Sequence, residues 1–388
     1  MNRSKIININ VIHLIFYFWF LIDFLVKTNI CDAINLNRYT INSFQNIITI
    51  VLITLYCVYG TQYEIKDLAI IATVGLLCLV TGIISNSYVL LSAFLFMIVV
   101  KDSDVEEIIE IVSKILLYLI PVVVVMCLLG IIEGGNTYRL SVIRYGLGFT
   151  HPNTLGWAIL ELLCCNFYIH RNYIRFTDYL FTIIAVLFLY LVPNSLSAVV
   201  GTIILLVLMI AYDLINRHAE VGRNIVSSIL VLLGIGVNFY SIFFTINDVA
   251  KYRIPSIIDK FASSRLFYTN KSFNMYGFKT FGQEIILKFA WEKGYMETYL
   301  DNSFATLLLR YGVVMYILYT IASIFVFKKL KETDFAMLIC FFVFYFMGVM
   351  NSSVLSVGQN VFMLCFGTVM FSNRNELISD DLIKYEEI

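Results

Sequence analysis

Twelve stretches of predominantly apolar residues follow one another along the chain, and this pattern limits the fold more than any other feature. A helix needs about 20 mostly apolar residues to cross a bilayer. We therefore predict an all-α, polytopic membrane protein with about twelve spans, in a single domain over residues 1–388. Two stretches, 88–100 and 179–192, are short for a full crossing, so ten or eleven spans remain an alternative. The predicted spans are residues 7–26, 44–60, 68–84, 88–100, 113–132, 153–169, 179–192, 196–212, 225–245, 303–327, 335–350 and 356–372.

The composition excludes an ordinary soluble domain. Of the 388 residues, 60% are apolar and 14% are charged, against roughly 45–50% and 25% in soluble proteins. Twenty-seven basic residues balance 27 acidic ones, so no excess of positive charge points to nucleic acid. The eight cysteines include no Cys-x-x-Cys pair, and seven of them fall in predicted spans. This pattern argues against a disulfide framework or a zinc site, and we expect neither a metal nor a cofactor.

The distribution of basic residues predicts the orientation in the membrane. Cytoplasmic loops of membrane proteins are enriched in Lys and Arg. With the N-terminus inside, the inner segments hold fourteen basic residues and the short outer segments hold four, namely Lys27, Arg38, Arg139 and Arg144. We therefore predict that both termini are cytoplasmic.

One long connection, residues 246–302, lies on the outer side in this orientation. Long loops of this kind are usually functional. It contains two stretches with the apolar spacing of short amphipathic helices. Such helices lie in the membrane interface, as monotopic helices do, or form a solvated cap on the bundle, and both descriptions can hold together. The apolar positions are Ile254, Ile257, Ile258 and Phe261 in the first stretch, and Ile285, Ile286 and Phe289 in the second.

Residues suited to chemistry gather first in the outer loop 138–156, which holds Arg139, Arg144 and His151. His151 and Pro152 directly precede Asn153, where the sixth span begins, so Asn153 is a candidate for the helix N-cap. A helix N-terminus attracts anions. The alternative is that both arginines merely contact lipid phosphates and that His151 caps the helix.

Three further outer places carry polar residues. Ser263-Ser264-Arg265 and, later, Gly282-Gln283 lie in the long loop, and an arginine fork suits phosphate better than a lysine does. Asp301-Asn302-Ser303 begins the tenth predicted span, and Arg310 follows within it. The polar loop 351–360 separates the last two spans.

An intramembrane ion pair is a further hypothesis. Glu161 lies eight residues beyond Asn153, and Arg310 lies eight residues beyond Asn302, which is ~12 Å along a helix in each case. Both helices enter from outside, so the two charges sit at similar depth. Ionisable residues in spans normally face the bundle interior and pair, so we expect a Glu161–Arg310 pair beneath an outer cavity.

A set of short motifs follows the same outer side of the chain. The motifs are Arg144…Gly148-Phe149-x-His151-Pro152-Asn153-x-Leu155-Gly156, Asn194-Ser195, Ser264-Arg265, Tyr276-Gly277, Phe281-Gly282-Gln283, Asp301-Asn302-Ser303 and Leu309-Arg310-Tyr311-Gly312. In their order, and in the one long outer loop before the tenth span, they resemble the Wzy-type O-antigen and capsular polysaccharide polymerases of bacteria, which are relatives of the O-antigen ligases. The resemblance covers the chain from about Thr137 to its end.

The resemblance implies a glycosyltransferase reaction at the outer face of the bacterial cytoplasmic membrane. Such proteins join oligosaccharide repeat units, carried on undecaprenyl pyrophosphate, into surface polysaccharide without a nucleotide sugar or a metal. The expected partners are the lipid-linked oligosaccharide and membrane lipid, and a chain-length regulator and a flippase are further candidates. Two alternatives stay open: an O-antigen ligase-like transferase, and a lipid-linked oligosaccharide flippase or other transporter.

The chemistry of that reaction gives roles to the outer residues. Negative charge develops on the leaving pyrophosphate, and preorganised cations stabilise it in the transition state. The acceptor hydroxyl benefits from a general base. His151 is the first candidate for this base because an unperturbed histidine titrates near neutrality, and Asp301 is the second. The expected substrate-binding residues are Arg139, Arg144, Asn153, Arg265, Gln283, Asn302 and Arg310.

Overall fold

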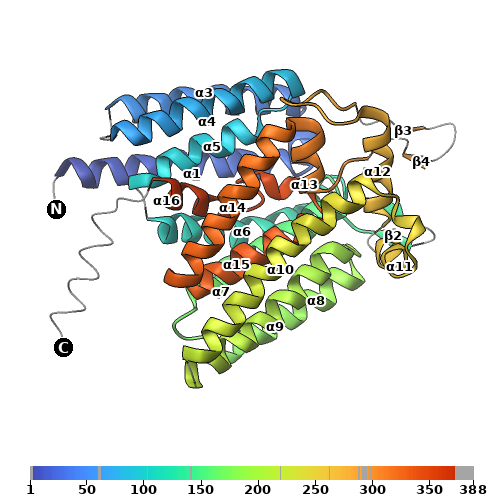
Figure 1. Ribbon diagram of the computed structural model, residues 1–388. Helices are drawn as coiled ribbons and strands as arrows, with labels where there is room; N and C mark the ends of the chain where they lie inside the picture. The colour runs from blue at the N-terminus through green and yellow to red at the C-terminus, as the bar shows by residue number, and fades with distance from the viewer. Residues whose placement is uncertain are drawn as a thin grey trace.

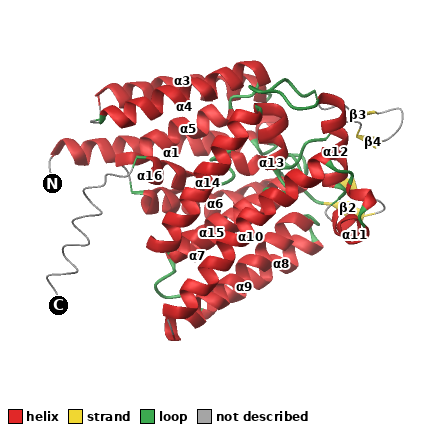
Figure 2. Ribbon diagram, viewed as in Figure 1, coloured by secondary structure: helices red, strands yellow, loops and turns green. Residues whose placement is uncertain are grey.

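The computed structural model describes residues 3–59, 63–102, 104–139, 142–218, 220–261, 263–286, 289–290, 295–296 and 299–371. Over these ranges the protein is 77% helical, with sixteen α-helices and two small two-stranded sheets. Figure 2 shows the strands confined to one end of a helical bundle. The predicted all-α class is therefore confirmed.

Every predicted span overlaps a helix of the bundle. These helices are α1 (Arg3–Val26), α3 (Arg38–Tyr59), α4 (Ile65–Ser85), α5 (Val89–Val99), α6 (Val105–Leu128), α7 (Pro152–Ile169), α8 (Phe176–Leu191), α9 (Leu196–His218), α10 (Glu220–Ile246), α14 (Val313–Thr333), α15 (Phe335–Met347) and α16 (Cys365–Met370). The prediction of a helix over 356–372 is, however, wrong in its first half, where the chain forms a turn and a 3₁₀ helix (Val361–Leu364) before α16. Within the described ranges, α4, α6, α14 and the larger parts of α9 and α10 are long and apolar enough to cross a membrane. The bundle is thus consistent with an α-helical membrane protein, and the number of crossings stays a prediction.

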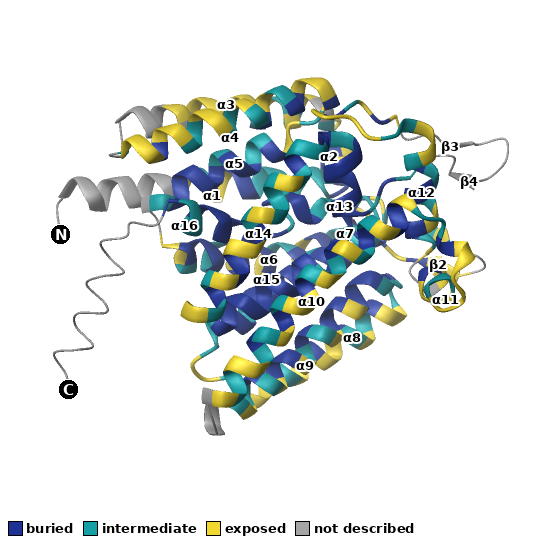
Figure 3. Cartoon of the chain, in the orientation of Figure 1, coloured by how far each residue is buried: buried dark blue, intermediate teal, exposed yellow. Residues whose placement is uncertain are grey.

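Large apolar side chains are exposed on the outer helices as well as buried in the interior, and Figure 3 shows exposed residues along those helices. α15 lies in the interior, and twelve of its thirteen residues are buried. On the outer helices Leu76, Ile83 and Leu187 are 62%, 61% and 55% exposed. Soluble monomers rarely expose apolar surface continuously, whereas helices in lipid are apolar towards the bilayer and towards their neighbours. The exposed surface therefore supports a position in the membrane.

The tenth predicted span is not one continuous helix, so the prediction of a helix over 303–327 is wrong in its first third. The chain forms the short helix α13 (Ser303–Thr306) and a π-helical turn (Leu307–Tyr311), and α14 begins only after Gly312. Gly312 has φ +96°, and a Cβ there would lie 2.3 Å from the backbone nitrogen of Gly282. The close approach of the outer loop therefore needs glycine at this break.

The long connection that is predicted to lie outside is partly helical. After α10 come a 3₁₀ turn (Val249–Lys251), α11 (Arg253–Phe261) and α12 (Arg265–Tyr276), followed by the hairpin β3 (Phe289–Ala290) and β4 (Tyr295–Met296). The first predicted amphipathic helix is confirmed by α11. The second is wrong, because Ile285 and Ile286 lie in irregular chain before β3.

Residues of the predicted outer side gather at one end of the molecule. In Figure 1, α1 begins and α16 lies at the left, whereas α11, α12 and the short strand β2 (Val142–Arg144) lie at the right. The short helix α2 (Ile30–Ala33) follows α1, and β2 pairs with β1 (Thr137–Arg139). The site is built at this end.

Candidate functional site

The hairpin of β1 and β2 places two predicted arginines on one face. Thr137 pairs with Arg144, and Arg139 pairs with Val142. Because side chains alternate along a strand and paired residues share a face, Arg139 and Arg144 project from the same side. Burial lowers the pKa of Arg139, and the positive charge of Arg265 lowers it further. The three guanidinium groups are therefore close enough to repel one another.

Arg144 is held by contacts from α7 and from the turn before α9. Its Nε donates to the carbonyl of Pro193 at 3.2 Å, and its Nη2 donates to Oδ1 of Asn153. The same Oδ1 accepts a hydrogen bond from the hydroxyl of Ser195 at 3.1 Å. Burial, with the positive charges of Arg139 and Arg265, lowers the pKa of Arg144 to about 10, so the side chain is still a cation at neutral pH.

His151 caps the N-terminus of α7, as one of the two interpretations of the sequence predicted. Its Nδ1 accepts the backbone N–H of Asn153 at 3.0 Å, with Pro152 at the first helical position. Asn153 therefore is not the N-cap, and its side chain positions Arg144 instead. Because Nδ1 accepts a hydrogen bond, the neutral ring carries its proton on Nε2.

The electrostatic setting keeps His151 neutral. Burial, followed by the positive charge of Arg144, lowers the pKa of His151 to about 4, while Asp301 acts in the opposite direction. A ring with this pKa and this tautomer is a hydrogen-bond donor at neutral pH. The geometry therefore favours a donor role for His151 over the role of general base that the sequence suggested.

Asp301 joins Arg265 to the chain that leads into α13. Nη1 of Arg265 lies 3.0 Å from Oδ2 of Asp301, which also accepts the hydroxyl of Tyr299 at 2.7 Å. Oδ1 accepts the backbone N–H of Ser352 at 3.2 Å. Burial, followed by the charge of Asp301, raises the pKa of Tyr299, so Tyr299 acts here as a donor.

A polar cavity of about 320 Å³ opens between these segments. It receives side chains from the start of α7, from the chain just before α13, and from the loop between α15 and α16. Both predicted catalytic residues and one predicted binding residue line it. The lining residues are His151, Asn153, Thr154, Trp157, Tyr299, Asp301, Asn351, Ser353 and Gln359.

Several of these residues were not predicted from the sequence. Tyr299 carries no motif, and Trp157 reads as an ordinary apolar residue of a span. Asn351, Ser353 and Gln359 belong to the polar loop 351–360, whose run of amides and hydroxyls between two apolar spans was the available signal. In the part of the chain that the structure describes, no group of three or more His, Cys, Asp or Glu side chains is placed to hold a metal ion.

Three predicted binding residues instead support the backbone around the break before α14. Gln283 donates to the carbonyls of Gly277 and Leu309 at 2.9 and 3.2 Å. Arg310 donates to the carbonyl of Ile285 at 3.4 Å. Asn302 is fully buried, caps α13 and accepts the hydroxyl of Ser241. None of the three lines the polar cavity. Their contacts therefore indicate support of the backbone and not contact with a substrate.

The predicted pair between Glu161 and Arg310 is wrong. The break before α14 redirects the chain around Arg310, which binds a loop carbonyl. Glu161 is buried, and its Oε1 accepts the backbone N–H of Val361 at 3.0 Å. Among the described residues no ion pair joins the two side chains. The matched-depth argument failed because it assumed one straight helix through residue 310.

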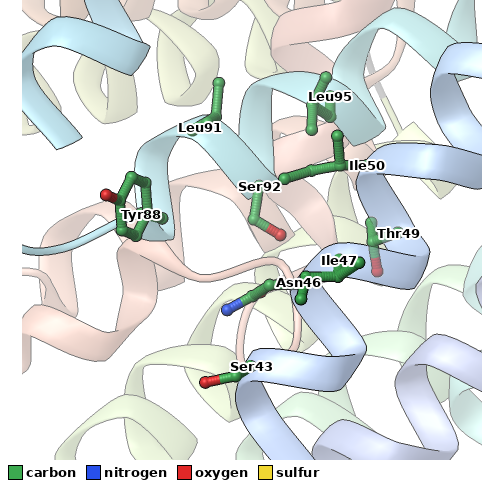
Figure 4. Close-up of a pocket in the computed structure, with 9 residues that line it drawn as sticks. All are labelled: Ser43, Asn46, Ile47, Thr49, Ile50, Tyr88, Leu91, Ser92 and Leu95. Atoms are coloured by element: carbon green, nitrogen blue, oxygen red, sulfur yellow. The ribbon is translucent and has the colours of Figure 1, made fainter. Parts of the chain in front are cut away.

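A second cavity, of about 240 Å³, lies between α3 and α5 (Figure 4). Apolar residues such as Ile47, Ile50, Leu91 and Leu95 line it together with a few hydroxyl and amide groups. No predicted site residue contributes to it, and its lining carries no charged group. The polar cavity beside the three arginines is therefore the candidate functional site. No family model, curated protein or solved structure matches the chain.

Proposed function

We propose that this protein is a polysaccharide polymerase that joins oligosaccharide repeat units carried on a polyprenyl pyrophosphate such as undecaprenyl pyrophosphate. In this proposal the chain spans the bacterial cytoplasmic membrane about twelve times, with both termini inside. The candidate site faces the extracytoplasmic side, where the lipid-linked units are polymerised into surface polysaccharide.

The observation that carries the proposal is the convergence of Arg139, Arg144 and Arg265 beside a polar cavity at the end of an apolar bundle. Asp301 pairs with Arg265, and an additional anion would reduce the remaining repulsion among the three cations. A lipid-linked pyrophosphate supplies such an anion at the level of the membrane surface. Arginine forks bind phosphate oxygens in bidentate geometry.

The proposed step breaks one bond and forms one. The anomeric carbon of the growing glycan leaves the pyrophosphate oxygen, which keeps the electron pair, and bonds to a hydroxyl of the next lipid-linked unit. The arginines stabilise the charge on the leaving oxygen because they are already in place when it develops. The Nε2–H of His151 donates to an oxygen of the substrate in the cavity.

The acceptor proton goes to Asp301 in this scheme and then to water. Asp301 lines the cavity, and among the described residues its Oδ1 accepts one hydrogen bond, from the N–H of Ser352, so this oxygen can accept a second one from the acceptor hydroxyl. Glycosyl transfer proceeds through an oxocarbenium-like transition state.

The deciding experiment uses the purified full-length protein in lipid vesicles with lipid-linked repeat units. We expect longer glycans to form on the lipid carrier without any nucleotide sugar. A strict requirement for a nucleotide sugar would contradict the donor assignment.

A gene deletion separates the polymerase from the ligase-like alternative. Loss of a polymerase leaves single repeat units on the final acceptor, whereas loss of a ligase leaves finished polymer on the lipid carrier. The first outcome is expected, and the second would replace the proposal.

A further inference from the structure

The helix α11 turns its apolar face away from the protein. Ile254, Ile257 and Ile258 are 70%, 49% and 52% exposed. Their i, i+3, i+4 spacing places them on one face of the helix. Contiguous exposed apolar side chains of this size usually mark a contact with a membrane or a partner.

The opposite face of α11 is tied to α12. Asp259 is 2% exposed, and its two carboxylate oxygens accept the backbone N–H groups of Leu266 and Phe267 at 2.8 and 3.1 Å. The polar side of α11 therefore faces the protein and the apolar side faces outward. A solvated cap has the reverse arrangement, because it buries its apolar face on the bundle.

Chain length and charge indicate what covers this face. Six residues separate the end of α10, a candidate span, from the start of α11, and they reach at most ~20 Å when fully extended. Lys251, Arg253 and Lys260 flank the apolar face and are exposed. A helix with an apolar face and cationic flanks suits the headgroup layer of a bilayer with anionic lipids.

We propose that α11 lies in the outer headgroup layer of the bilayer, with its isoleucine face in the acyl boundary and its cations at anionic phospholipids, and that this anchoring sets the position of Arg265 relative to the membrane surface. Arg265 is the first residue of α12, whose N–H groups Asp259 binds. The contact of α11 with lipid does not depend on the proposed reaction. The role of this contact in positioning Arg265 rests on the proposed function.

Spin-label accessibility tests the docking in the full-length protein. Ile257→Cys and Ile258→Cys are labelled with a nitroxide in nanodiscs that hold one copy each, and Lys279→Cys, an exposed loop position, calibrates the assay. Unsubstituted protein treated identically controls for the native cysteines. We expect oxygen to reach the α11 labels better than a water-soluble nickel complex does. The reverse order, as in a solvated cap or a face covered only by a second copy, would overturn the proposal.

The lipid class is tested by the charge of the disc. The α11 labels should lie deeper in discs containing phosphatidylglycerol than in pure phosphatidylcholine. Replacing Lys251, Arg253 and Lys260 together by Gln should abolish this difference. Equal depth of the unsubstituted helix in both lipids would contradict the role of anionic headgroups.

The functional arm compares two double variants of the same positions. Ile257→Asp with Ile258→Asp should release α11 from the lipid and slow glycan elongation about 10- to 100-fold, as small misplacements of binding groups do. Ile257→Leu with Ile258→Leu keeps the apolar face, so this variant should retain both the lipid contact of α11 and the normal rate of elongation. Released α11 with unchanged elongation would overturn the link to Arg265. The accessibility measurement needs no substrate, so its outcome is independent of the polymerase assignment.

Discussion

The two ring nitrogens of His151 have different tasks. Nδ1 accepts the N–H of Asn153 in the first turn of α7, which leaves the proton of the neutral ring on Nε2, and His151 lines the polar cavity. A histidine used as a helix cap cannot also offer the same lone pair to a substrate proton. The burial that makes the ring a good cap also lowers its pKa to about 4, and both effects point to one protonation state at neutral pH.

The pH profile of glycan elongation tests this assignment. Because the pKa of His151 in the folded protein is about 4, the neutral donor form stays fully populated as the pH falls from 8 to about 5.5. We expect no inflection from His151 in this range. His151→Asn, which still caps a helix, should lower the rate without changing the shape of the profile. An inflection near pH 6.5 that His151→Asn removes would restore the general-base role.

Removing single arginines tests the cation cluster. Arg144→Ala and Arg265→Ala should each slow elongation by roughly 10²–10³-fold, as the loss of one preorganised group at a developing charge does, and shorten the glycan in cells. Arg38→Ala is the matched control, because Arg38 donates to the carbonyl of Thr28 and to Asn29 outside the cluster. Gel electrophoresis of the glycan measures its length, and an immunoblot shows whether the variant protein is present in normal amount. Normal-length polymer in both cluster variants would remove the arginines from the mechanism.

At the scale of elements, apolar periodicity predicted the helices well because lipid and core both demand long apolar runs. It predicted α11 on different grounds, from the i, i+3, i+4 spacing of its apolar residues. It did not predict the break before α14, since Leu307, Leu308 and Leu309 read as an ordinary span. The break depends on a loop approaching Gly312 from 30 residues earlier in the chain, and a local pattern contains no information about that contact.

The candidate site divides in the same way. Arg144, His151, Arg265 and Asp301 were predicted because charged and imidazole groups are rare in an apolar chain, and the fold brings them together. Arg310 is also a charged residue in an apolar stretch, yet it donates a hydrogen bond to the backbone carbonyl of Ile285 beside the break. Residue type alone selected the candidates, and only the three-dimensional contacts distinguish a donor from a base and a binding group from a structural one.

Gly312→Ala tests whether the break is required. A Cβ at φ +96° would meet the backbone of Gly282 at 2.3 Å, so we expect a loss of stability above ~1 kcal/mol, measured as a lower Tm in detergent. Gly236 in α10 is the control, because a Cβ there meets nothing within 4 Å. Gly236→Ala should leave the Tm equal or higher. Equal stability of both variants would show that the break tolerates other residues.

At the scale of the whole molecule, labelling of single cysteines tests the orientation. Lys279→Cys in the long loop should react with a membrane-impermeant maleimide in intact cells. Lys328→Cys near the end of α14 should react only after the cells are opened. Both lysines are exposed, so access to the reagent decides the result. The opposite pattern would invert the predicted topology and remove the site from the extracytoplasmic side.

The distance along the chain between the parts of the site has a consequence for biogenesis. The arginines of the hairpin precede Arg265 by more than 120 residues, and the cavity closes only with the loop before α16. A chain still leaving the ribosome carries two of the three guanidinium groups but neither Asp301 nor the loop 351–360. The candidate site is therefore complete only after nearly the whole protein has been made, so an unfinished chain lacks part of the cavity that the proposed function requires.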